Sequence, residues 1–396
     1  MMGIMDSSIS NETSNHIMKA PQTHLAFYKE LGVSPVHQDI SDLGQHIDRR
    51  RSLYRSLGVL PKLIHKARVL EVAPGSGHNS LFIAACQPTN LTMVEPNPVG
   101  VQEIKELYAG FDLQHTMPKL VDSKLEDYQP DDTFDIVICE GWLGSAPHEH
   151  EMLAKHGSMV SPGGVLCVSL VSPIGLLANI LRRLLTVQVT SGIDAQEHIS
   201  LLKTAFAPHL NTLSDMSRPH EDWVIDNMIN PAWYGVCLTP AMTVDVLGDT
   251  FDHYGFSPRM ISDLRWYKSL YGDNRNFNAA FLDSFYCTAH NLLDHRKQAD
   301  AQVSTHNRQI EDVCFDLLKK VMAFEFDGAG IEPVLKILET LKPMIQVVSP
   351  EMERAIVETQ TLLDQTALRP EHIANMDRLT PLFGREMMYT SFTRES

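Results

Sequence analysis

The chain has 396 residues and a formal net charge of −16 at pH 7, because 49 acidic side chains face only 33 Lys and Arg. Since domains commonly hold about 100 to 200 residues, this length suffices for two or three folding units with a sizeable core. Affinity for nucleic acid comes largely from Lys and Arg that neutralise phosphates, so we expect no nucleic-acid partner for so acidic a chain.

The cysteines and the apolar runs indicate the cellular compartment in which the protein is expected. Six cysteines are scattered through apolar stretches, with no CxxC pair and no spacing typical of a metal site. No uninterrupted apolar run reaches the roughly 20 residues that a membrane span needs, and the N-terminus lacks a basic-then-apolar signal pattern. We therefore expect reduced thiols, no membrane span and a cytoplasmic location.

The first 64 residues contain two kinds of sequence. Residues 1–22 are polar and without periodicity, which predicts a flexible tail, whereas residues 23–64 show helical spacing and predict an N-terminal helical cap. The cap contains three consecutive arginines, which point in different directions on a helix and cannot all face one site. A solvated face is the simpler interpretation; the alternative is that Arg50 reaches over a cleft to hold a substrate carboxylate or phosphate.

Residues 68–80 combine a strand, a glycine loop and a helix start. A short apolar run carries Glu71 near its end, breaks into a turn with Gly75 and Gly77, and continues as the apolar stretch from Leu81. Glycine lets a ligand approach the backbone closely, and the free N–H groups of a helix start favour an electron-rich group nearby. This stretch therefore predicts a cradle for a nucleotide-type cofactor.

The region from 65 to 171 alternates apolar runs with helix-like pieces. The runs lie at residues 68–72, 91–95, 119–123, 134–140 and 165–171. This rhythm is typical of an α/β fold with a parallel, doubly wound sheet that is covered on both faces. Ligands of such sheets bind outside the carboxyl ends of the strands, so we expect the polar residues after each run to share one rim.

Several of these motifs resemble class I S-adenosylmethionine-dependent methyltransferases. Glu71-Val-Ala-Pro-Gly75-Ser-Gly77 is similar to the family's first motif, in which an acid ends the first strand and a Gly-x-Gly loop follows. Glu95 resembles the acid that closes the second strand, and residues 134–140 and 161–166 resemble the fourth strand and the turn before the fifth. The resemblance covers about residues 65–171. It implies a Rossmann-like core and S-adenosyl-L-methionine as the cofactor.

The resemblance also implies roles for individual residues. Glu71 would hold the methionine ammonium indirectly, Glu95 the ribose hydroxyls, and the stretch from Asp122 the adenine. The full implied set is Glu71, Ala73, Gly75, Gly77, His78, Glu95, Pro96, Asp122, Ser123, Leu125 and Glu140. Two positions depart from the motif, because Ala73 and His78 stand where the family often has glycine. His78 could meet the methionine carboxylate, a substrate or solvent.

A dinucleotide is the competing cofactor. The run from Gly75 to Ser80 is nearly Gly-x-Gly-x-x-Gly, and Glu95 lies close to the ~20-residue spacing of a ribose-binding acid. However, Ser80 replaces the third glycine, and a dinucleotide site does not call for an acid at Glu71. We therefore favour the methyltransferase. The alternatives are an NAD(P)-dependent oxidoreductase or sugar epimerase, and a non-catalytic subunit that binds S-adenosylmethionine.

Methyl transfer requires few catalytic groups. It is an in-line displacement that depends on alignment, and a base is needed only for a weakly acidic acceptor. Glu140, at the tip of the fourth predicted strand, is the best-placed anchor or base, with a loop-capping role as the equal alternative. His148 is the second catalytic candidate. His148 and His150 also suggest a metal site, but on a helix residues i and i+2 diverge, so we expect no metal.

Residues 172–238 are expected to form an insertion that builds the substrate pocket. The apolar run 173–189, interrupted by Arg182 and Arg183, predicts a lid over the cleft rather than a membrane-surface helix. Aromatic, acidic and amide side chains are dense farther on. The candidates for contacts with a small-molecule or sugar-type acceptor are Arg50, Trp142, His150, Trp223, Asp226, Asn227 and Tyr234.

The last third of the chain is expected to complete the sheet and then become helical. Within residues 239–298 we expect a helix over 239–254 and a strand within 259–267. Residues 299–396 show only helical stripes of apolar residues, which predict an all-helical C-terminal domain. Such a domain would brace the core or form a homodimer.

Overall fold

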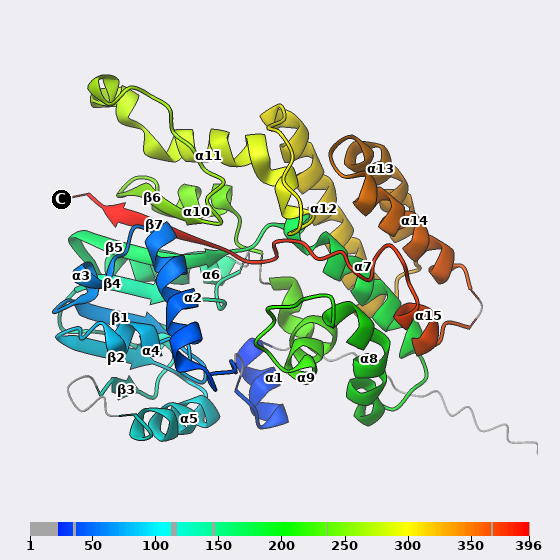
Figure 1. Ribbon diagram of the computed structural model, residues 1–396, viewed down its shortest axis with the longest axis horizontal. Helices are drawn as coiled ribbons and strands as arrows, with labels where there is room; N and C mark the ends of the chain where they lie inside the picture. The colour runs from blue at the N-terminus through cyan, green and yellow to red at the C-terminus, as the bar shows by residue number, and fades with distance from the viewer. Residues whose placement is uncertain are drawn as a thin grey trace, which may run out of the picture.

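The computed structural model describes residues 23–34, 37–111, 117–144, 147–235, 237–365 and 367–395. The chain forms an α/β half built on one sheet and a helical half beside it (Figure 1). The long central helix of the helical half begins only three residues after strand β5 (Val160–Leu170) ends. The helical half therefore adjoins the carboxyl ends of the parallel strands.

The sheet has seven strands in the order β3-β2-β1-β4-β5-β7-β6. Their bounds are β1 (Arg68–Val72), β2 (Asn90–Val94), β3 (Lys119–Val121), β4 (Phe134–Cys139), β5 (Val160–Leu170), β6 (Phe251–Ser257) and β7 (Met388–Arg394). Strands β1 to β5 are parallel, whereas β7 is antiparallel to both β5 and β6. The expectation of a doubly wound, Rossmann-like sheet is confirmed.

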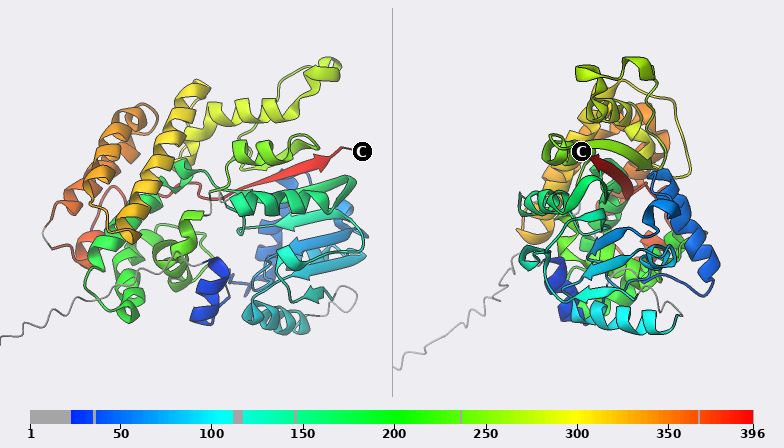
Figure 2. Two further views of the ribbon diagram at one scale, coloured as in Figure 1. Left: turned by 180° about the vertical axis from the view of Figure 1, so that it is seen from behind. Right: turned by 90° about the vertical axis from the view of Figure 1, so that its left-hand side faces the viewer.

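Helices cover both faces of this sheet (Figure 2). They are α2 (Leu43–Ser56), α3 (Pro61–Ile64), α4 (Leu81–Ala85), α5 (Pro98–Ala109), α6 (Pro147–Ser158) and α10 (Pro240–Leu247). In β1, Val69 joins the hydrophobic cluster of Tyr54 and Phe82, and the next residue, Leu70, joins the opposite cluster with Leu153. Because both faces are buried, the strands are apolar without alternation, which is why the sequence pattern locates them well.

The helical half is assembled from two stretches that lie far apart in the sequence. The first supplies α7 (Pro173–Val189), α8 (Ala195–Leu210), α9 (His220–Val224), the π-helical η2 (Ile225–Ile229) and η3 (Pro231–Gly235). The second supplies α11 (Phe277–Thr288), α12 (Ser304–Phe326), α13 (Glu332–Val348), α14 (Pro350–Leu363) and α15 (Pro370–Ala374). Helix α7 packs against α12 and α14, and α8 packs against α15. No helix in the described ranges is long and apolar enough to cross a membrane.

Helix α7 is the buried axis of the helical half, so the expectation of a lid is wrong. Arg182 and Arg183, which suggested an exposed face, are both fully buried. Arg183 forms two hydrogen bonds of 2.9 Å with the carboxylate of Glu325, and Arg182 donates to backbone carbonyls. A buried guanidinium is tolerated where hydrogen bonds satisfy its donors, and helices packed around α7 supply them here.

The structure also corrects the end of the chain. The helix expected over 239–254 ends at Leu247, and residues 251–257 form β6 instead of the strand expected within 259–267. The C-terminal region is helical from Ser304 to Ala374 as expected, but residues 388–394 form β7 between β5 and β6. The side chains of β7 include Tyr389, Thr390 and Phe392, which favour a strand once a partner is present.

Candidate active site

The loop after β1 adopts the conformation that its glycines allow. Gly75 and Gly77 have φ angles of 60° and 78°, and Ala73 has a φ of 54°. A Cβ on Gly77 would lie 2.8 Å from Cγ1 of Ile104, so only glycine fits there without a shift of α5. Ala73 thus occupies a left-handed conformation that favours glycine, the residue that the family motif often has at this position.

Glu95 connects the end of β2 to this loop. Its Oε2 accepts a hydrogen bond from the backbone N–H of Gly75 at 2.9 Å, and its Oε1 accepts one from Asn97 at 2.8 Å. Burial raises the pKa of Glu95 to about 7, although both N–H donors oppose the shift. The acid of β2 therefore lies against the glycine loop, where both could contact one ligand.

Glu71 carries a buried carboxylate, and one of its two oxygens forms no hydrogen bond with the described residues. The residue is 4 % exposed, and within the described part of the chain no hydrogen-bond partner reaches its Oε2. Burial, followed by the charge of Glu140, raises the pKa of Glu71 to about 7. A buried carboxylate of this kind gains from a cationic ligand group. The buried carboxylate and the glycine loop therefore fit the cofactor that the sequence implies.

Glu71→Gln is expected to flatten the pH dependence of folding stability. The folded pKa of about 7 exceeds the ordinary value of 4.5, so the folded protein holds the extra proton between these values and loses stability as the pH rises. By pH 8 the free energy of unfolding has fallen by on the order of 3 kcal/mol. Urea unfolding at pH 5 and pH 8 should show a smaller decrease for the variant. Exposed Glu106→Gln should behave as wild type, and an unchanged slope in Glu71→Gln would contradict the assignment.

The residues expected to surround adenine follow β3. Asp122 is exposed, Ser123 is half-buried and donates from Oγ to the carbonyl of Lys124 at 2.9 Å, and Leu125 is buried at the start of η1 (Leu125–Asp127). Pro96 is half-buried and directly follows Glu95. The structure thus brings these residues to the same edge as the glycine loop. Their contacts with a cofactor remain predictions.

Glu140 and Arg50, predicted separately as catalytic and substrate-binding, contact each other. Arg50 Nη2 donates to Glu140 Oε1 at 2.6 Å, and the two side chains expose only 8 % and 11 % of their area. The hydroxyl of Tyr54 donates to the same oxygen at 2.9 Å. Although burial opposes it, Glu140 raises the pKa of Arg50. Glu140 is therefore an oriented ion-pair partner rather than a free base, with Oε2 unpartnered among the described residues.

Tyr54 was not predicted as a site residue. It lies in the helical cap predicted for residues 23–64, and its ring centroid is 5.3 Å from that of Phe82. A buried tyrosine nevertheless requires a partner for its hydroxyl, and this was the available signal. The position of that partner, 86 residues later, could not be read from the spacing.

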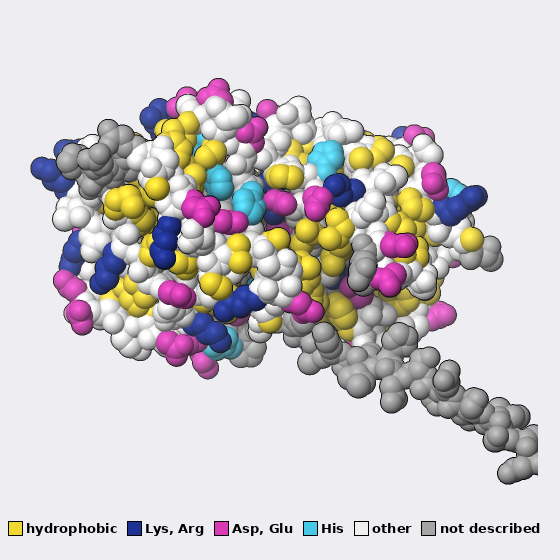
Figure 3. All heavy atoms as spheres, turned by 90° about the horizontal axis from the view of Figure 1, so that it is seen from below, with side chains coloured by type: hydrophobic (Ala, Val, Ile, Leu, Met, Phe, Trp, Pro, Cys, Tyr) yellow, Lys and Arg dark blue, Asp and Glu magenta, His cyan; other side chains and the backbone are white. Residues whose placement is uncertain are grey.

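His78 lies at the mouth of the loop as a neutral side chain. Its Nδ1 is 2.7 Å from Ser76 Oγ, and its backbone carbonyl is 2.9 Å from His46 Nε2. Burial, His37 and His46 lower the pKa of His78 to about 4. On the molecular face shown in Figure 3, several His side chains (cyan) lie next to Asp and Glu side chains (magenta). His78 can therefore offer a hydrogen bond near pH 7 but no positive charge to a ligand carboxylate.

The histidines of α6 do not join Glu140. His148 is exposed and its Nε2 contacts Glu126 Oε1 at 3.0 Å, which places it on the outer rim and gives the predicted catalytic role no support. His150 is half-buried, and Trp142 is half-buried with its ring 6.0 Å from that of His156. Across the described ranges, no group of three His, Cys, Asp or Glu could hold a metal ion.

Two of the acceptor-pocket candidates belong to the core of the helical half. Trp223 is 5 % exposed and packs edge-on against Phe206 and Phe383. Asn227 is buried, donates to the carbonyl of Trp223 at 3.0 Å and accepts from Asn179 at 3.3 Å. These contacts correct the predicted substrate role to a packing role. Tyr234 lies in η3, and its side chain is outside what the structure describes.

Asp226, from the same stretch, has different surroundings. It accepts hydrogen bonds from the hydroxyl of Tyr28 in α1 (His24–Leu31) and from Arg218 Nη2. Its side chain is 20 % exposed, and burial raises its pKa to about 7. Helix α1 lies between the two halves in Figure 1, so Asp226 helps to hold α1 against the helical half.

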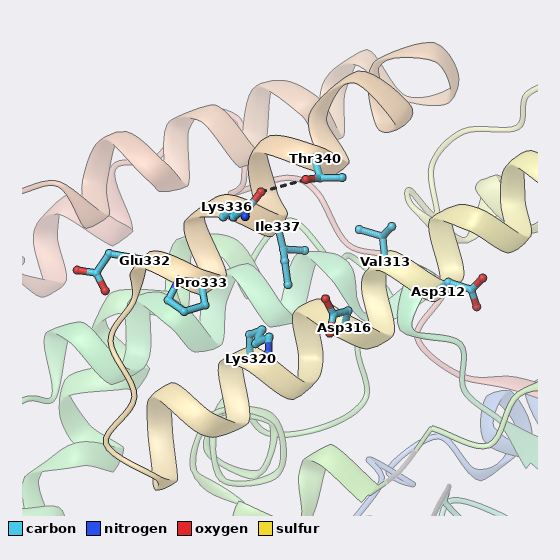
Figure 4. Close-up of a pocket in the computed structure, with 9 residues that line it drawn as sticks. All are labelled: Asp312, Val313, Asp316, Lys320, Glu332, Pro333, Lys336, Ile337 and Thr340. Atoms are coloured by element: carbon cyan, nitrogen blue, oxygen red, sulfur yellow. Dashed lines mark hydrogen bonds between the residues drawn. The ribbon is translucent and has the colours of Figure 1, made fainter.

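A groove lies between α12 and α13 (Figure 4). Asp316, Lys320 and Ile337 are among the side chains that line it. All of its lining residues belong to these two helices, and none comes from the sheet edge. This groove is therefore separate from the site built by Glu71, Glu95 and Glu140.

The topology and the rim agree with the resemblance found in the motifs. The parallel strands β1 to β5, with acids closing β1 and β2 around a glycine loop, fit the Rossmann-like core that the motifs implied. Residues 45–206 match a family model described as a methyltransferase domain. This part of the chain is a methyltransferase domain.

Solved methyltransferase structures resemble parts of the chain. A putative methyltransferase from Thermoplasma acidophilum is 26 % identical over 27 % of this chain and 44 % of its own, with a TM-score of 0.23. The N-methyltransferase NodS from Bradyrhizobium japonicum WM9, in complex with S-adenosyl-L-homocysteine, is 17 % identical over 31 % and 60 %, with a TM-score of 0.26. The chain thus spans less than two thirds of either structure. A comparison with curated proteins gave no match.

Proposed function

We propose that the whole chain is an S-adenosylmethionine-dependent methyltransferase that acts on a small-molecule or sugar-type acceptor. The observation that carries the proposal is the cradle of Glu71, the Gly75 loop and Glu95 at the carboxyl ends of β1 and β2. When bound, the cofactor supplies an electrophilic methyl group on a sulfonium. Glu71 would hold its ammonium, Glu95 its ribose, and the residues from Asp122 to Leu125 its adenine.

The chain contributes mainly alignment to this reaction. Arg50 and Tyr54 fix one oxygen of Glu140, so that its other oxygen can accept a hydrogen bond from an acceptor. The reaction needs the nucleophile in line with the methyl and sulfur, and a carboxylate held on two sides has little freedom to misplace it. Glu140 is thus proposed as the acceptor anchor rather than as a general base.

The N-terminal segment favours a small acceptor over a macromolecule. The carbonyl of Val33 accepts a hydrogen bond from Asn97 at 3.0 Å, beside the glycine loop. His37 contacts Glu103 of α5 at 3.1 Å and Asp222 of α9 at 3.5 Å. His37 therefore bridges α5 of the cofactor half and α9 of the helical half. A bridge beside the cofactor edge supports restricted access for a large acceptor.

Calorimetry with S-adenosylhomocysteine and NAD tests the cofactor. We expect binding of the former and none of the latter, and the opposite result would overturn the proposal. The dinucleotide alternative is disfavoured because a common dinucleotide-binding sheet has the order 3-2-1-4-5-6, without the reversed strand found here. A labelled methyl-transfer assay over an acceptor library separates an enzyme from a binding subunit, which would bind S-adenosylhomocysteine without turnover.

Two further proposals concern the cellular location and the oligomeric state of the protein. We propose a cytoplasmic location, supported by six cysteines that are all free thiols. We also retain a homodimer through the C-terminal helices, because Val347 of α13 and Val357 of α14 expose 68 % and 41 % of their area. A light-scattering mass equal to one chain of 44.5 kDa would contradict the dimer.

A further inference from the structure

An arm of the chain projects from the sheet half between β6 and α11. It comprises residues 258–276, which include the 3-10 helices η4 (Tyr267–Ser269) and η5 (Gly272–Arg275). In Figures 1 and 2 this segment, coloured yellow-green, extends beyond the other elements of the sheet half. Four of its large apolar side chains are exposed, and they are Leu264 (94 %), Trp266 (66 %), Tyr267 (73 %) and Tyr271 (71 %). Single exposed apolar residues need no explanation, whereas a cluster of this kind marks an interaction surface.

The arm is held in one shape although little of it is buried. Nη1 of Arg265 donates to the carbonyls of Asn274 at 2.8 Å and Asn276 at 3.3 Å, which ties the two ends of the loop together. The same guanidinium forms hydrogen bonds of 2.6 to 3.0 Å with Asp263, and it lies 5.4 Å from the ring centre of Phe277. The exposed aromatic side chains are therefore presented on a preorganised loop, which lowers the entropy cost of binding a partner.

The charge of the arm differs from that of the rest of the chain. The arm contains four Lys or Arg and two Asp, whereas the whole chain contains 33 basic and 49 acidic residues. Lys268 lies at the tip, with its Nζ 5.3 Å from the ring centre of Trp266. A cation beside exposed aromatic rings suits a protein surface that is apolar with acidic residues around it. An anionic bilayer is a less suitable partner, because its surface repels the acidic remainder of the chain.

The groove between α12 and α13 has this character. Its apolar lining residues are Val313, Pro333 and Ile337, and three of its five charged lining residues are acidic. In Figure 4, Ile337 points from α13 toward α12, beside Asp316. The groove has a volume of about 760 Å³, within the roughly 300–1,000 Å³ of pockets that bury a drug-sized ligand. It is therefore large enough to receive aromatic side chains of the arm.

Two copies of the chain satisfy both features at once. In Figure 1 the arm lies at the upper left and helices α12 and α13 lie at the upper right, so the arm points away from the groove of its own chain. A second copy, turned upside down in this view and set against the upper edge, brings each arm to the groove of the other copy. This arrangement has closed two-fold symmetry, the commonest symmetry of homo-oligomers.

The surface involved is sufficient for a stable dimer. Aromatic side chains bury about 150–250 Å² each, so the three exposed ones of the arm offer on the order of 400 Å² at their observed exposure. With a similar area from each groove, two arms in two grooves bury on the order of 1,600 Å², the size of a standard stable interface.

We propose that the arm docks into the α12–α13 groove of a second copy of this chain, and that two copies exchange arms in a dimer. Trp266 packs on the apolar lining of the groove around Ile337, and Lys268 faces the acidic residues beside it. The inference goes beyond methyl transfer and does not depend on it. It names the segment that meets the C-terminal helices, and the binding of S-adenosylhomocysteine tests the proposed function separately.

Light scattering and sedimentation of the full-length protein test the exchange. Wild type should have twice the chain mass of 44.5 kDa. Trp266→Ser in the arm and Ile337→Glu in the groove should each weaken the dimer by about tenfold or more, as expected for an aromatic anchor and its pocket. A mixture of these two variants should recover dimers, because one intact arm meets one intact groove in each mixed pair. Leu63→Ser, which removes a 53 % exposed side chain of α3, should behave as wild type.

Charge reversal gives a second test that a folding defect does not imitate. Lys268 and Asp316 are both exposed, so neither substitution removes a core contact. Lys268→Glu and Asp316→Lys should each weaken the dimer, and both together in one chain should restore most of the lost affinity. A double variant as weak as the single ones would contradict the docking of Lys268 in the groove.

Three other outcomes would overturn the proposal. The first is a monomeric wild type, or a dimer that Trp266→Ser leaves intact. The second is a dimer that needs Trp266 but tolerates Ile337→Glu and Asp316→Lys, which would indicate contact between two arms. The third is a monomeric wild type that sediments with vesicles of phosphatidylcholine and phosphatidylserine and loses this binding in Trp266→Ser, which would assign the arm to a membrane surface.

Discussion

Arg182→Met is expected to lower the free energy of unfolding by about 3–5 kcal/mol, the range typical of removing one partner of a buried charged network. Nη2 of Arg182 donates to the carbonyls of Leu379 at 2.9 Å and Leu382 at 2.8 Å, and the guanidinium lies 3.8 Å from the ring centre of Phe383. Methionine fills much of the volume but leaves both buried carbonyls without a donor.

The same substitution is expected to loosen the segment that leads into β7. Residues 379–383 precede β7, so Arg182 anchors this segment against α7. Urea unfolding measures the stability change. Arg354→Met is the matched control, because that arginine is exposed and lies 3.5 Å from Glu351. A loss below about 1 kcal/mol would show that the carbonyls find other donors.

The cofactor half was the most predictable part of the fold. Expected strands at residues 68–72, 91–95 and 134–140 agree with β1, β2 and β4 to within one residue at each end. Parallel strands buried on both faces are continuous apolar runs, so a local pattern contains the information. The loop from Glu71 to Gly77 is likewise contiguous, and its composition alone indicates a close ligand.

The reversed strand could not be found in this way. Strand β7 pairs with β5, which lies more than 200 residues earlier in the chain, and with β6, from which helices α11 to α15 separate it. Nothing local distinguishes residues 388–394 as a strand of this sheet until those partners exist. Helical stripes before it favoured one helical domain to the end of the chain. Pairing between strands that are so far apart in the chain cannot be read from the local patterns of a single sequence.

The sequence predicted which residues lie at the ends of the strands, but it did not predict which of them contact one another. The rim position of Glu140 followed from the strand rhythm, but its pairing with Arg50, 90 residues earlier, did not. Conversely, the aromatic and amide density around Trp223 indicated a pocket, whereas the structure uses Trp223 to pack the helices. Composition cannot tell a pocket wall from the core behind it, because both are lined by the same residue types.

Arg182 and Arg183 show that the burial of a charged side chain also cannot be predicted from local sequence. Adjacent arginines in an apolar run suggested an exposed interruption, since charged side chains are rarely buried without partners. The partners exist, but Glu325 and the carbonyls of residues 379 and 382 come from the far end of the chain. The two predicted units, 172–238 and 299–396, are joined through these buried charges.

Glu95→Ala is expected to weaken binding of S-adenosylhomocysteine by about a hundredfold. Hydrogen bonds to a charged group contribute roughly 1.5–3 kcal/mol, and 1.4 kcal/mol corresponds to a factor of ten in affinity. The variant loses the proposed ribose contacts, and it also frees the N–H groups of Gly75 and Asn97 that Glu95 now holds. Calorimetry at pH 8 measures the affinity, with exposed Glu106→Ala as the control that should match wild type.

Stability distinguishes the loss of a ligand contact from a general loss of structure. Burial raises the pKa of Glu95 to about 7, above its ordinary value of 4.5, so its ionised form opposes folding at pH 8 and its removal relieves that cost. Glu95→Ala should therefore bind S-adenosylhomocysteine far more weakly while its loss of unfolding free energy at pH 8 stays within about 1 kcal/mol. Unchanged affinity would show that Glu95 serves only to hold the glycine loop, and the ribose assignment would then be wrong.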